Sequence, residues 1–368
     1  VERSRGLGDV YKRQNKMSGL EKEVFSFDML GEAARTPQQA NDYFESYRDA
    51  IHEVGKINTK RNLSNGVSIK ISALHPRYEM RKINQIESEL LPKLKELVIY
   101  AHSKNVEITI DAEEQDRLSL SLHIIENLAN EKKIKDWPGF GIALQAYGKR
   151  SFDVIHWLSE ILTKRDSIHL RLVKGAYWDY EIKHAQVSGY EGYPVFSKKS
   201  FTDIAYLACA KEILKNKKIF PKFATHNAHT ISSIHHIGKN YNYEFQRLYG
   251  MGELLYKSAS EVLGVNRSPS VYAPIGSYKD LLPYLVRRLL ENGANSSFIN
   301  RLLDPDTNSE WLAENPYVRV ENEKKEIPLP KQIFTNRQNS SGIDISESDN
   351  LVTLKNRLMN FDDKLIIA

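Results

Sequence analysis

Hydrophobic positions along the chain form short strand-like runs that alternate with longer helical patterns. The runs are rich in β-branched, aromatic and aliphatic residues, whereas the stretches between them repeat apolar residues every three or four positions. The predicted strands are "VFSFDML" (24–30), "VSIKIS" (67–72), "VEITIDAE" (106–113), "GIALQAY" (141–147), "IHLRLVKG" (168–175), "KFATH" (222–226), "YEFQRLYG" (243–250) and "SVYAPIG" (270–276). Helical patterns cover about residues 87–103, 116–129, 151–164, 200–216, 229–238 and 278–292.

A further helix follows the first run and carries its own start signal. Thr36 is a predicted N-cap, Pro37 fits the first helical position, and Gln39 completes a capping box. Apolar residues follow at helical spacing, and Gly55 predicts the end of this helix.

Eight strands alternating with helices predict an α/β protein with a distorted (β/α)8 TIM-type barrel. An open doubly wound sheet is the alternative. No G-x-G-x-x-G follows any predicted strand, so the usual dinucleotide signature of that alternative is missing.

Composition narrows the class of protein. The chain is 41% hydrophobic and 27% charged, and its apolar runs are too short for a membrane span. The formal net charge is +5, but residues 1–17 hold five Lys/Arg and two Asp/Glu, so +3 comes from this tip. The near-neutral remainder argues against nucleic-acid binding. Cys209 is the single cysteine, which excludes a disulfide framework and fits a cytoplasmic protein.

Three segments are expected. Residues 1–23 carry no apolar period and are expected to lie outside the fold, as a poorly defined segment of the kind that a non-native extension forms. Residues 24–330 form the barrel domain. Residues 331–368 follow a Pro-rich stretch and begin a new helical pattern, which predicts a linker and the truncated start of a further domain.

Polar residues gather at the ends of the predicted strands, where a (β/α)8 barrel carries its active site. Eight strands showing the same pattern predict a polar mouth on an apolar barrel, which is typical of a ligand site. The residues are Asp28, Lys70, Asp111, Glu113, Glu114, Gln145, Tyr147, Arg171, Lys174, His226, Asn227, Gln246, Tyr249 and Tyr272.

Three chemistries can use such a mouth. Metal-assisted hydrolysis needs ligands such as His75, Asp111, His226 and His229, but no H-x-H or H-E-x-x-H is present. Acid–base catalysis could use Asp111 with Glu113 or Glu114. The sequence does not indicate which carboxylates would act together, because Glu113 and Glu114 are adjacent and face opposite ways in a strand.

The third chemistry is a redox reaction on a bound organic cofactor. It is favoured by the segment "RLVKGAYWDYE" (171–181). Arg171 and Lys174 are charges in an apolar strand, where a charge needs a partner. The Gly-Ala pair that follows permits close approach of the backbone to a ligand, and Trp178 offers a flat face.

The predicted helix at 280–293 adds adjacent cations. Arg287 and Arg288 project about 100° apart on its surface, and Glu291 lies within reach of either. Either this is an ordinary solvated face, or the two arginines clamp a substrate carboxylate.

Several long motifs resemble the proline dehydrogenase domain of the bifunctional proline utilization A (PutA) flavoproteins. They are "VSIKISALHPRYE", "IDAEEQDRL", "LRLVKGAYWDYEIKHAQ", "FATHNAHT", "FQRLYGMGE", "VYAPIG" and "YLVRRLLENGANSSF", in matching order over about residues 24–330.

The resemblance implies a non-covalent FAD and oxidation of L-proline to 1-pyrroline-5-carboxylate, with hydride transfer from proline C5 to flavin N5 and a membrane quinone as electron acceptor. This is the first step of proline catabolism to glutamate. It implies these FAD contacts: Asp111, Gln145, Arg171, Val173, Lys174, Gly175, Ala176, Trp178, Ser197, Thr202, His226 and Asn227. Ser197 stands where the family often has Thr.

The implied proline site consists of Lys70, Asp111, Leu248, Tyr272, Tyr284, Arg287, Arg288 and Glu291, and Lys70, Asp111, Arg287 and Arg288 are its catalytic candidates. No metal is expected. The implied setting is the cytoplasm, with peripheral association at the inner membrane during turnover. The DNA-binding module and the second dehydrogenase that such family members often carry are not expected in this sequence. A metal-dependent hydrolase and a non-catalytic fragment of a larger regulatory protein remain the alternatives.

Overall fold

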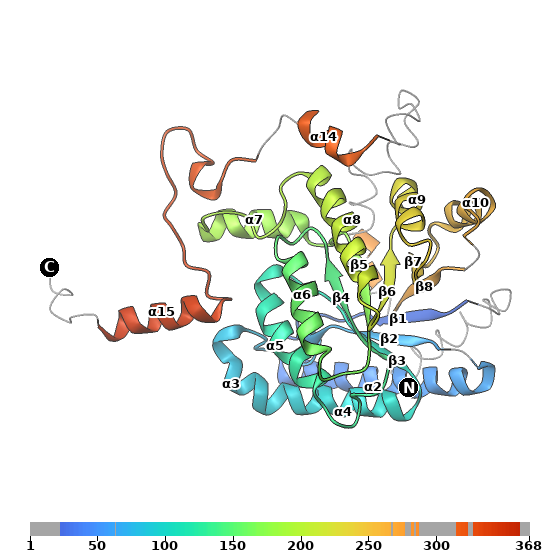
Figure 1. The fold of residues 1–368 in the computed structure, drawn as a ribbon. Coiled ribbons are helices and arrows are strands. Elements are labelled where there is room, and N and C mark those ends of the chain that lie inside the picture. The colour runs from blue at the N-terminus through green and yellow to red at the C-terminus, as the bar shows by residue number, and fades with distance from the viewer. Residues whose placement is uncertain are drawn as a thin grey trace, which may run out of the picture.

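A closed barrel of eight parallel strands forms the centre of the computed structural model. The structure describes residues 23–62, 64–265, 268–276, 281, 282, 285, 286, 314–322 and 327–360. Each strand pairs with the next along the chain, and β8 closes on β1, as Figure 1 shows. The strands are β1 (Phe25–Met29), β2 (Gly66–Ile69), β3 (Glu107–Ile110), β4 (Phe140–Gln145), β5 (Ile168–Val173), β6 (Ile219–Ala224), β7 (Glu244–Leu248) and β8 (Ser270–Ile275). The predicted fold class is confirmed.

Helices surround the strands (Figure 1). They are α2 (Pro37–Arg61), α3 (Ile83–Gln85), α4 (Leu91–Ser103), α5 (Leu118–Ala129), α6 (Ser151–Ile161), α7 (Trp178–Ser188), α8 (Lys199–Lys215), α9 (Ala228–Ile237) and α10 (Glu253–Leu263). The structure also describes α14 (Pro316–Asn322) and α15 (Ser348–Met359), which follow β8 along the chain. The predicted helix at 278–292 lies mostly outside the described residues.

The N-terminus of α2 confirms the predicted cap, but its C-terminus corrects the prediction. The Thr36 side chain accepts a hydrogen bond from the Gln39 amide. The helix continues past Gly55 to Arg61, and Asn62 caps its end in a left-handed conformation. A Cβ at position 55 would come within 2.9 Å of the Lys104 Cβ. Gly55 therefore permits a close helix contact and does not stop the helix.

The hydrophobic core lies between the strands and the helices. The outward side chains of β2, β4 and β5, such as Val67, Ile142 and Leu170, are buried against the helical layer. Polar side chains also lie below the strand ends at inward positions: Ser26 and His169 are the second residues of β1 and β5, and Lys222 lies in the middle of β6. This polar interior was not predicted from the sequence.

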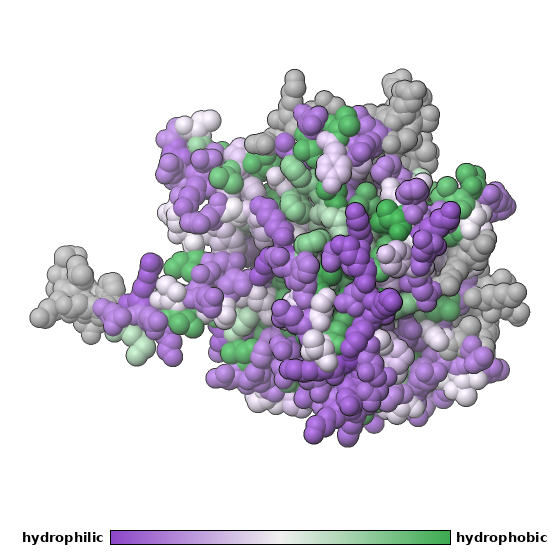
Figure 2. Space-filling model, in the orientation of Figure 1, coloured by the Kyte–Doolittle hydropathy of each residue, from purple (hydrophilic) through white to green (hydrophobic). Residues whose placement is uncertain are grey.

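The outer surface mixes hydrophilic and hydrophobic side chains. On the face in Figure 2, hydrophilic residues predominate over the lower helices, and hydrophobic groups gather near α9 and α10. Among the helices that the structure describes, none is both long and apolar enough to cross a membrane.

Candidate active site

Lys70 and two carboxylates form a buried ion cluster where β1, β2 and β3 end. The Lys70 Nζ lies 2.5 Å from Asp28 Oδ1 and 3.5 Å from Asp111 Oδ2. Burial opposes the charge of Lys70, but the attraction of Asp28, Tyr272 and Asp111 outweighs it and raises the pKa of this lysine well above its usual value. Lys70 is therefore an ammonium across the physiological pH range.

Arg171 reaches across the barrel interior to the same cluster. Its Nη1 donates to Asp111 Oδ1 at 2.6 Å and to Ser68 Oγ at 3.0 Å, and its Nη2 donates to Ser26 Oγ at 2.7 Å. The residue is only 2% exposed. The partner that a charge in this strand requires is thus Asp111, which the sequence alone did not identify.

Tyr272 completes the cluster from β8. Its hydroxyl donates to Asp111 Oδ2 at 2.9 Å, and its ring lies 4.9 Å from the Arg171 guanidinium carbon, a cation–π distance. Burial and the charges of Asp111 and Asp28 raise the pKa of Tyr272 well above its usual value, so the phenol stays protonated. Asp111 thus contacts three side chains from three other strands.

The segment after β5 turns sharply beside β4. Gly175 has φ +148°, and a Cβ there would come within 2.3 Å of the Tyr147 ring. Gln145 holds this turn, because its Oε1 accepts from the Ala176 amide at 3.0 Å and its Nε2 donates to the Glu113 carbonyl at 2.8 Å. The glycine is thus required by the protein's own packing.

Lys174, at the end of β5, pairs with Asp203 on α8, and Lys199 contacts the same carboxylate at 3.0 Å. Burial lowers the pKa of Lys174 to about 8, against the opposing attraction of Asp203. A lysine that is only just held in its charged form is well suited to an anionic ligand, which would stabilise the ammonium.

The other residues expected at the cofactor lie on neighbouring elements. Trp178 begins α7, is 36% exposed and donates from Nε1 to the Phe196 carbonyl at 2.9 Å. Val173 is half-buried at the end of β5, Ser197 is half-buried, and Thr202 is buried on α8.

Two expected residues follow β6. His226 Nε2 accepts a hydrogen bond from the Leu248 amide at 3.0 Å, which ties the ends of β6 and β7 together. Asn227 caps α9, with its Oδ1 accepting from the Thr230 amide at 2.9 Å. Both side chains are half-buried beside the barrel mouth.

The geometry does not favour the metal and paired-carboxylate chemistries. In the described residues, no group of three or more His, Cys, Asp or Glu side chains is arranged to hold a metal ion. His75 instead contacts Glu89. Because β3 ends at Ile110, Glu113 and Glu114 lie in the following loop, where both carboxylates contact Arg117.

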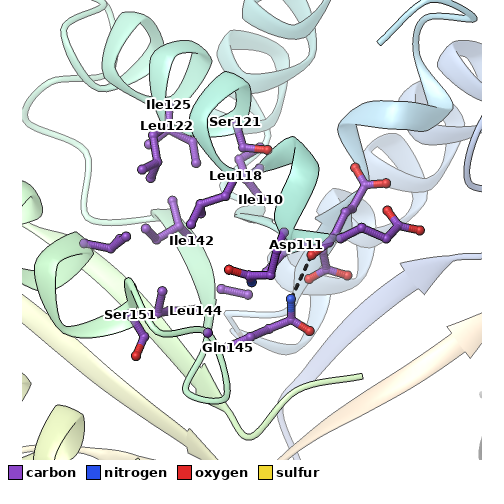
Figure 3. A pocket seen from close by; sticks show the side chains of 17 residues that line it. Ile110, Asp111, Leu118, Ser121, Leu122, Ile125, Ile142, Leu144, Gln145 and Ser151 are labelled. Carbon is purple, nitrogen blue, oxygen red and sulfur yellow. Dashed lines mark hydrogen bonds between the residues drawn. The ribbon is translucent and has the colours of Figure 1, made fainter. Parts of the chain in front are cut away.

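A small pocket lies behind the mouth, between β3, β4 and the helices α5 and α6 (Figure 3). Asp111 and Gln145 line it together with apolar residues such as Leu118, Ile125 and Ile142. Most of the expected site residues are absent from its walls, so this pocket only borders the candidate site.

Some of the expected substrate residues fall outside the described residues: Tyr284, Arg287, Arg288 and Glu291. Asp28 was expected at the mouth, and it pairs there with Lys70. Ser26, Ser68 and Asp203 were not predicted, although they contact Arg171 or Lys174 directly. Ser26 and Ser68 lie two residues before Asp28 and Lys70, on the same face of the strand, whereas Asp203 lies on α8 four residues after Lys199.

A closed parallel barrel with a charged and aromatic cluster at the carboxyl ends of its strands defines the chain as a (β/α)8 barrel of the enzyme type. The family model described as proline dehydrogenase matches residues 11–301. The chain belongs to the proline dehydrogenase family.

Curated relatives include the bifunctional protein PutA of Escherichia coli, 45% identical over 91% of this chain and 27% of that protein, and the PutA of Rhizobium meliloti, 41% identical over 95% and 30%. A crystal structure of a bifunctional PutA protein matches with a TM-score of 0.87 at 41% identity, over 93% of this chain and 36% of that chain. The chain thus spans about a third or less of these relatives' length.

Proposed function

We propose that this chain oxidises L-proline to 1-pyrroline-5-carboxylate with FAD as its cofactor and a quinone as the electron acceptor. The observation that supports this most is the cluster of Lys70, Arg171, Asp111 and Tyr272 at the barrel mouth, in a member of the proline dehydrogenase family. The quinone and a peripheral association with the membrane are supported by the family resemblance alone.

The side chains beside the mouth fit a flavin in their chemistry. FAD, when bound, would accept the hydride. Arg171 on β5 and Lys174 directly after it offer two cations for a phosphate or an electron-rich ring. Gln145 ends the neighbouring strand β4, and His226 and Asn227 follow the neighbouring strand β6. Trp178 presents a partly exposed aromatic face. Val173, Gly175, Ala176, Ser197 and Thr202 complete the proposed cofactor contacts.

The proposed substrate contacts match the two parts of proline. Leu248, Tyr272 and Tyr284 offer apolar surface for the ring, while Lys70, Arg287 and Arg288 offer cations for the carboxylate. Asp111 would hold Arg171 and Tyr272 in fixed directions, and Glu291 would brace the arginines. Orientation of the substrate, more than proton transfer, is the expected contribution of these residues to the rate.

A visible absorption spectrum before and after anaerobic addition of proline tests the cofactor and the substrate together. We expect flavin bands in the purified protein and bleaching on addition of L-proline. A colourless protein with no releasable flavin and no proline-dependent dye reduction would contradict the proposal. Hydrolase activity that depends on added zinc would instead favour a metal enzyme.

Arg288→Met tests the proposed carboxylate clamp. A charge-assisted hydrogen bond contributes about 1.5–3 kcal/mol, so the proline KM should rise about tenfold to a hundredfold with the flavin content unchanged. Steady-state kinetics and the ratio of flavin to protein absorbance measure both quantities. Loss of flavin at an unchanged KM would place Arg288 at the cofactor and not at the substrate.

A further inference from the structure

Polar side chains line the barrel interior through its whole height. Barrels of this kind are usually filled by branched apolar residues. Here most of the buried apolar residues alternate with the inward positions and face the helices, and many inward positions carry small or polar groups. These inward residues include Ser26, Ser68, Glu107, Thr109, Gly141, His169, Arg171, Lys222, Glu244, Gln246 and Ser270.

The interior groups form two hydrogen-bonded networks. The upper network centres on Arg171 and reaches Asp111 at the mouth. The lower network begins at Lys222, which lies 2.7 Å from Glu107 and 3.6 Å from Glu244. It continues through Ser270, which donates to Glu244 at 2.5 Å and accepts from Gln246 Nε2 at 3.0 Å. No direct hydrogen bond joins the two networks in the part of the chain that the structure describes.

The break between the networks falls within one layer of the barrel. Alternate strands contribute to each interior layer, and the strand register places Ser26, Thr109, Arg171 and Gln246 at the same height on β1, β3, β5 and β7. Arg171 is the lowest charged member of the upper network, and Gln246 is the last member of the lower one.

Each network presents an unpartnered polar atom at this break. Arg171 Nε and Gln246 Oε1 are both buried and make no hydrogen bond, and their residues are 2% and 1% exposed. One is a donor and the other an acceptor. A buried polar group left without a partner costs about 1–3 kcal/mol, and proteins commonly satisfy such groups with an ordered internal water molecule.

We propose that a buried water molecule bridges Arg171 Nε and Gln246 Oε1, and that Gln246 is a positioning residue for the Arg171 guanidinium. Through Gln246 and Ser270, the bridge connects Arg171 to the Lys222–Glu107 ion pair of the lower network, whose lysine lies on the neighbouring strand β6. Nη1 and Nη2 are already held by Asp111, Ser68 and Ser26, and a further contact at Nε fixes the plane of the guanidinium. The functional part of this inference rests on the proposed proline oxidation.

A crystal structure of the purified chain tests the water site without reference to activity. We expect ordered density within hydrogen-bond distance of both Arg171 Nε and Gln246 Oε1. A direct contact between the two side chains, or a dry gap with neither atom bonded, would overturn the water bridge. This result stands whether or not the protein oxidises proline.

Gln246→Met tests the positioning role. We expect the rate of flavin reduction by proline to fall about fivefold to tenfold and the flavin reduction potential to shift, while the proline KM stays within twofold, because Gln246 acts through Arg171 and does not contact the substrate. Gln246→Glu, which retains an acceptor oxygen, should recover part of the rate.

Gln115→Met is the matched control. Gln115 is also buried and also has an unpartnered Oε1, but it lies outside the barrel before α5. Its variant should show wild-type rates and potential. If Gln246→Met does not fold, Ser270→Ala removes the hydroxyl that anchors Gln246 and should lower the rate in the same way. Wild-type rate and potential in the folded Gln246 or Ser270 variant would overturn the positioning role, whereas a wild type without flavin would instead refute the proposed function.

Discussion

At the scale of single residues, the charge state of Lys174 differs from that of the other cations beside the mouth. Burial holds its pKa near 8, while Asp203 attracts its ammonium and Lys199 and Arg319 repel it. Lys70, by contrast, stays charged well above its usual pKa because of the carboxylates around it. One lysine is therefore a fixed charge and the other titrates near neutral pH.

We predict that FAD affinity falls as the pH rises through 8 if Lys174 contacts a phosphate. A bound anion favours the ammonium, so the free protein must take up a proton above pH 8 in order to bind, and the affinity should fall about tenfold between pH 7 and pH 9. Flavin titration of the apoprotein at several pH values measures this.

Two variants sharpen that test. Lys174→Met should weaken binding and remove the pH dependence. Lys199→Met removes a repulsive charge and should move the fall in affinity to higher pH. A steep pH dependence that survives in Lys174→Met would assign the titration to another group.

At the scale of elements, the turn between β5 and α7 has very little freedom. Gly175 takes a backbone conformation that residues with a Cβ rarely adopt, and the Tyr147 ring occupies the space that a Cβ would need. The same turn carries Lys174 at its start and leads into Trp178. Any adjustment of the backbone here would displace proposed cofactor contacts on both sides of the turn.

Gly175→Ala should therefore destabilise the fold by about 2 kcal/mol or more and lower the flavin content. Urea denaturation and the flavin-to-protein absorbance ratio measure the two effects. Gly192→Ala is the matched control, because no atom lies within 4 Å of its added Cβ and its φ is ordinary. Equal losses in both variants would show that the turn is not specially constrained.

The sequence predicted the strands better than the helices that join them. Each strand run was found, although Pro221 concealed the start of β6 at Ile219. Of the helices that the structure describes, α7 and α10 were not predicted, and neither were the short helices α3 and α14. The reason is clearest for α7 and α10. The first begins directly after a turn with no side-chain cap at Tyr177, and the second follows Gly252, so neither shows the usual N-terminal signal.

The site was predictable as a set of residues but not as a set of contacts. Spacing placed Lys70, Asp111, Arg171 and Tyr272 at strand ends, and barrel closure brings them together. The hydrogen bonds from Arg171 to Asp111 and Ser26 join strands that lie far apart in the sequence, and a local pattern carries no information on such pairs. The polar interior could not be predicted from the sequence either. A two-residue period shows that a strand has two different faces, but it does not tell which face the barrel encloses.

At the scale of the whole molecule, the segment from residue 327 to 347 runs along the outside of the barrel and ties α7 to α5 and α6. The Tyr193 hydroxyl donates to the Pro328 carbonyl at 2.7 Å, and the Gly342 amide donates to the Gly189 carbonyl at 2.8 Å. Glu347 accepts from Arg150 at 2.5 Å and from Ser119 at 2.7 Å. After Glu347, α15 packs against the short helical turn at Met80–Lys82 and then projects away from the barrel (Figure 1).

Arg150→Met should release this segment without unfolding the barrel. The ion pair to Glu347 is partly exposed, so its loss should cost only about 0.5–1 kcal/mol of global stability, while proteolytic cleavage between residues 336 and 347 should become several-fold faster. Limited proteolysis and urea denaturation measure the two quantities. Lys331→Met, which loses only a 3.9 Å contact to exposed Glu191, is the control and should be cleaved at the wild-type rate.

The ion cluster at the mouth also has a consequence for how an anion is recognised. Lys70 and Arg171 are matched by Asp28 and Asp111, so the four formal charges sum to zero. The rigid barrel therefore supplies oriented donors but no surplus positive charge for a carboxylate. That surplus must come from elsewhere, and Arg287 and Arg288 in the sequence after β8 are the proposed source. We therefore expect that substitutions in that segment alone, with the barrel unchanged, would alter the preference for a negatively charged substrate.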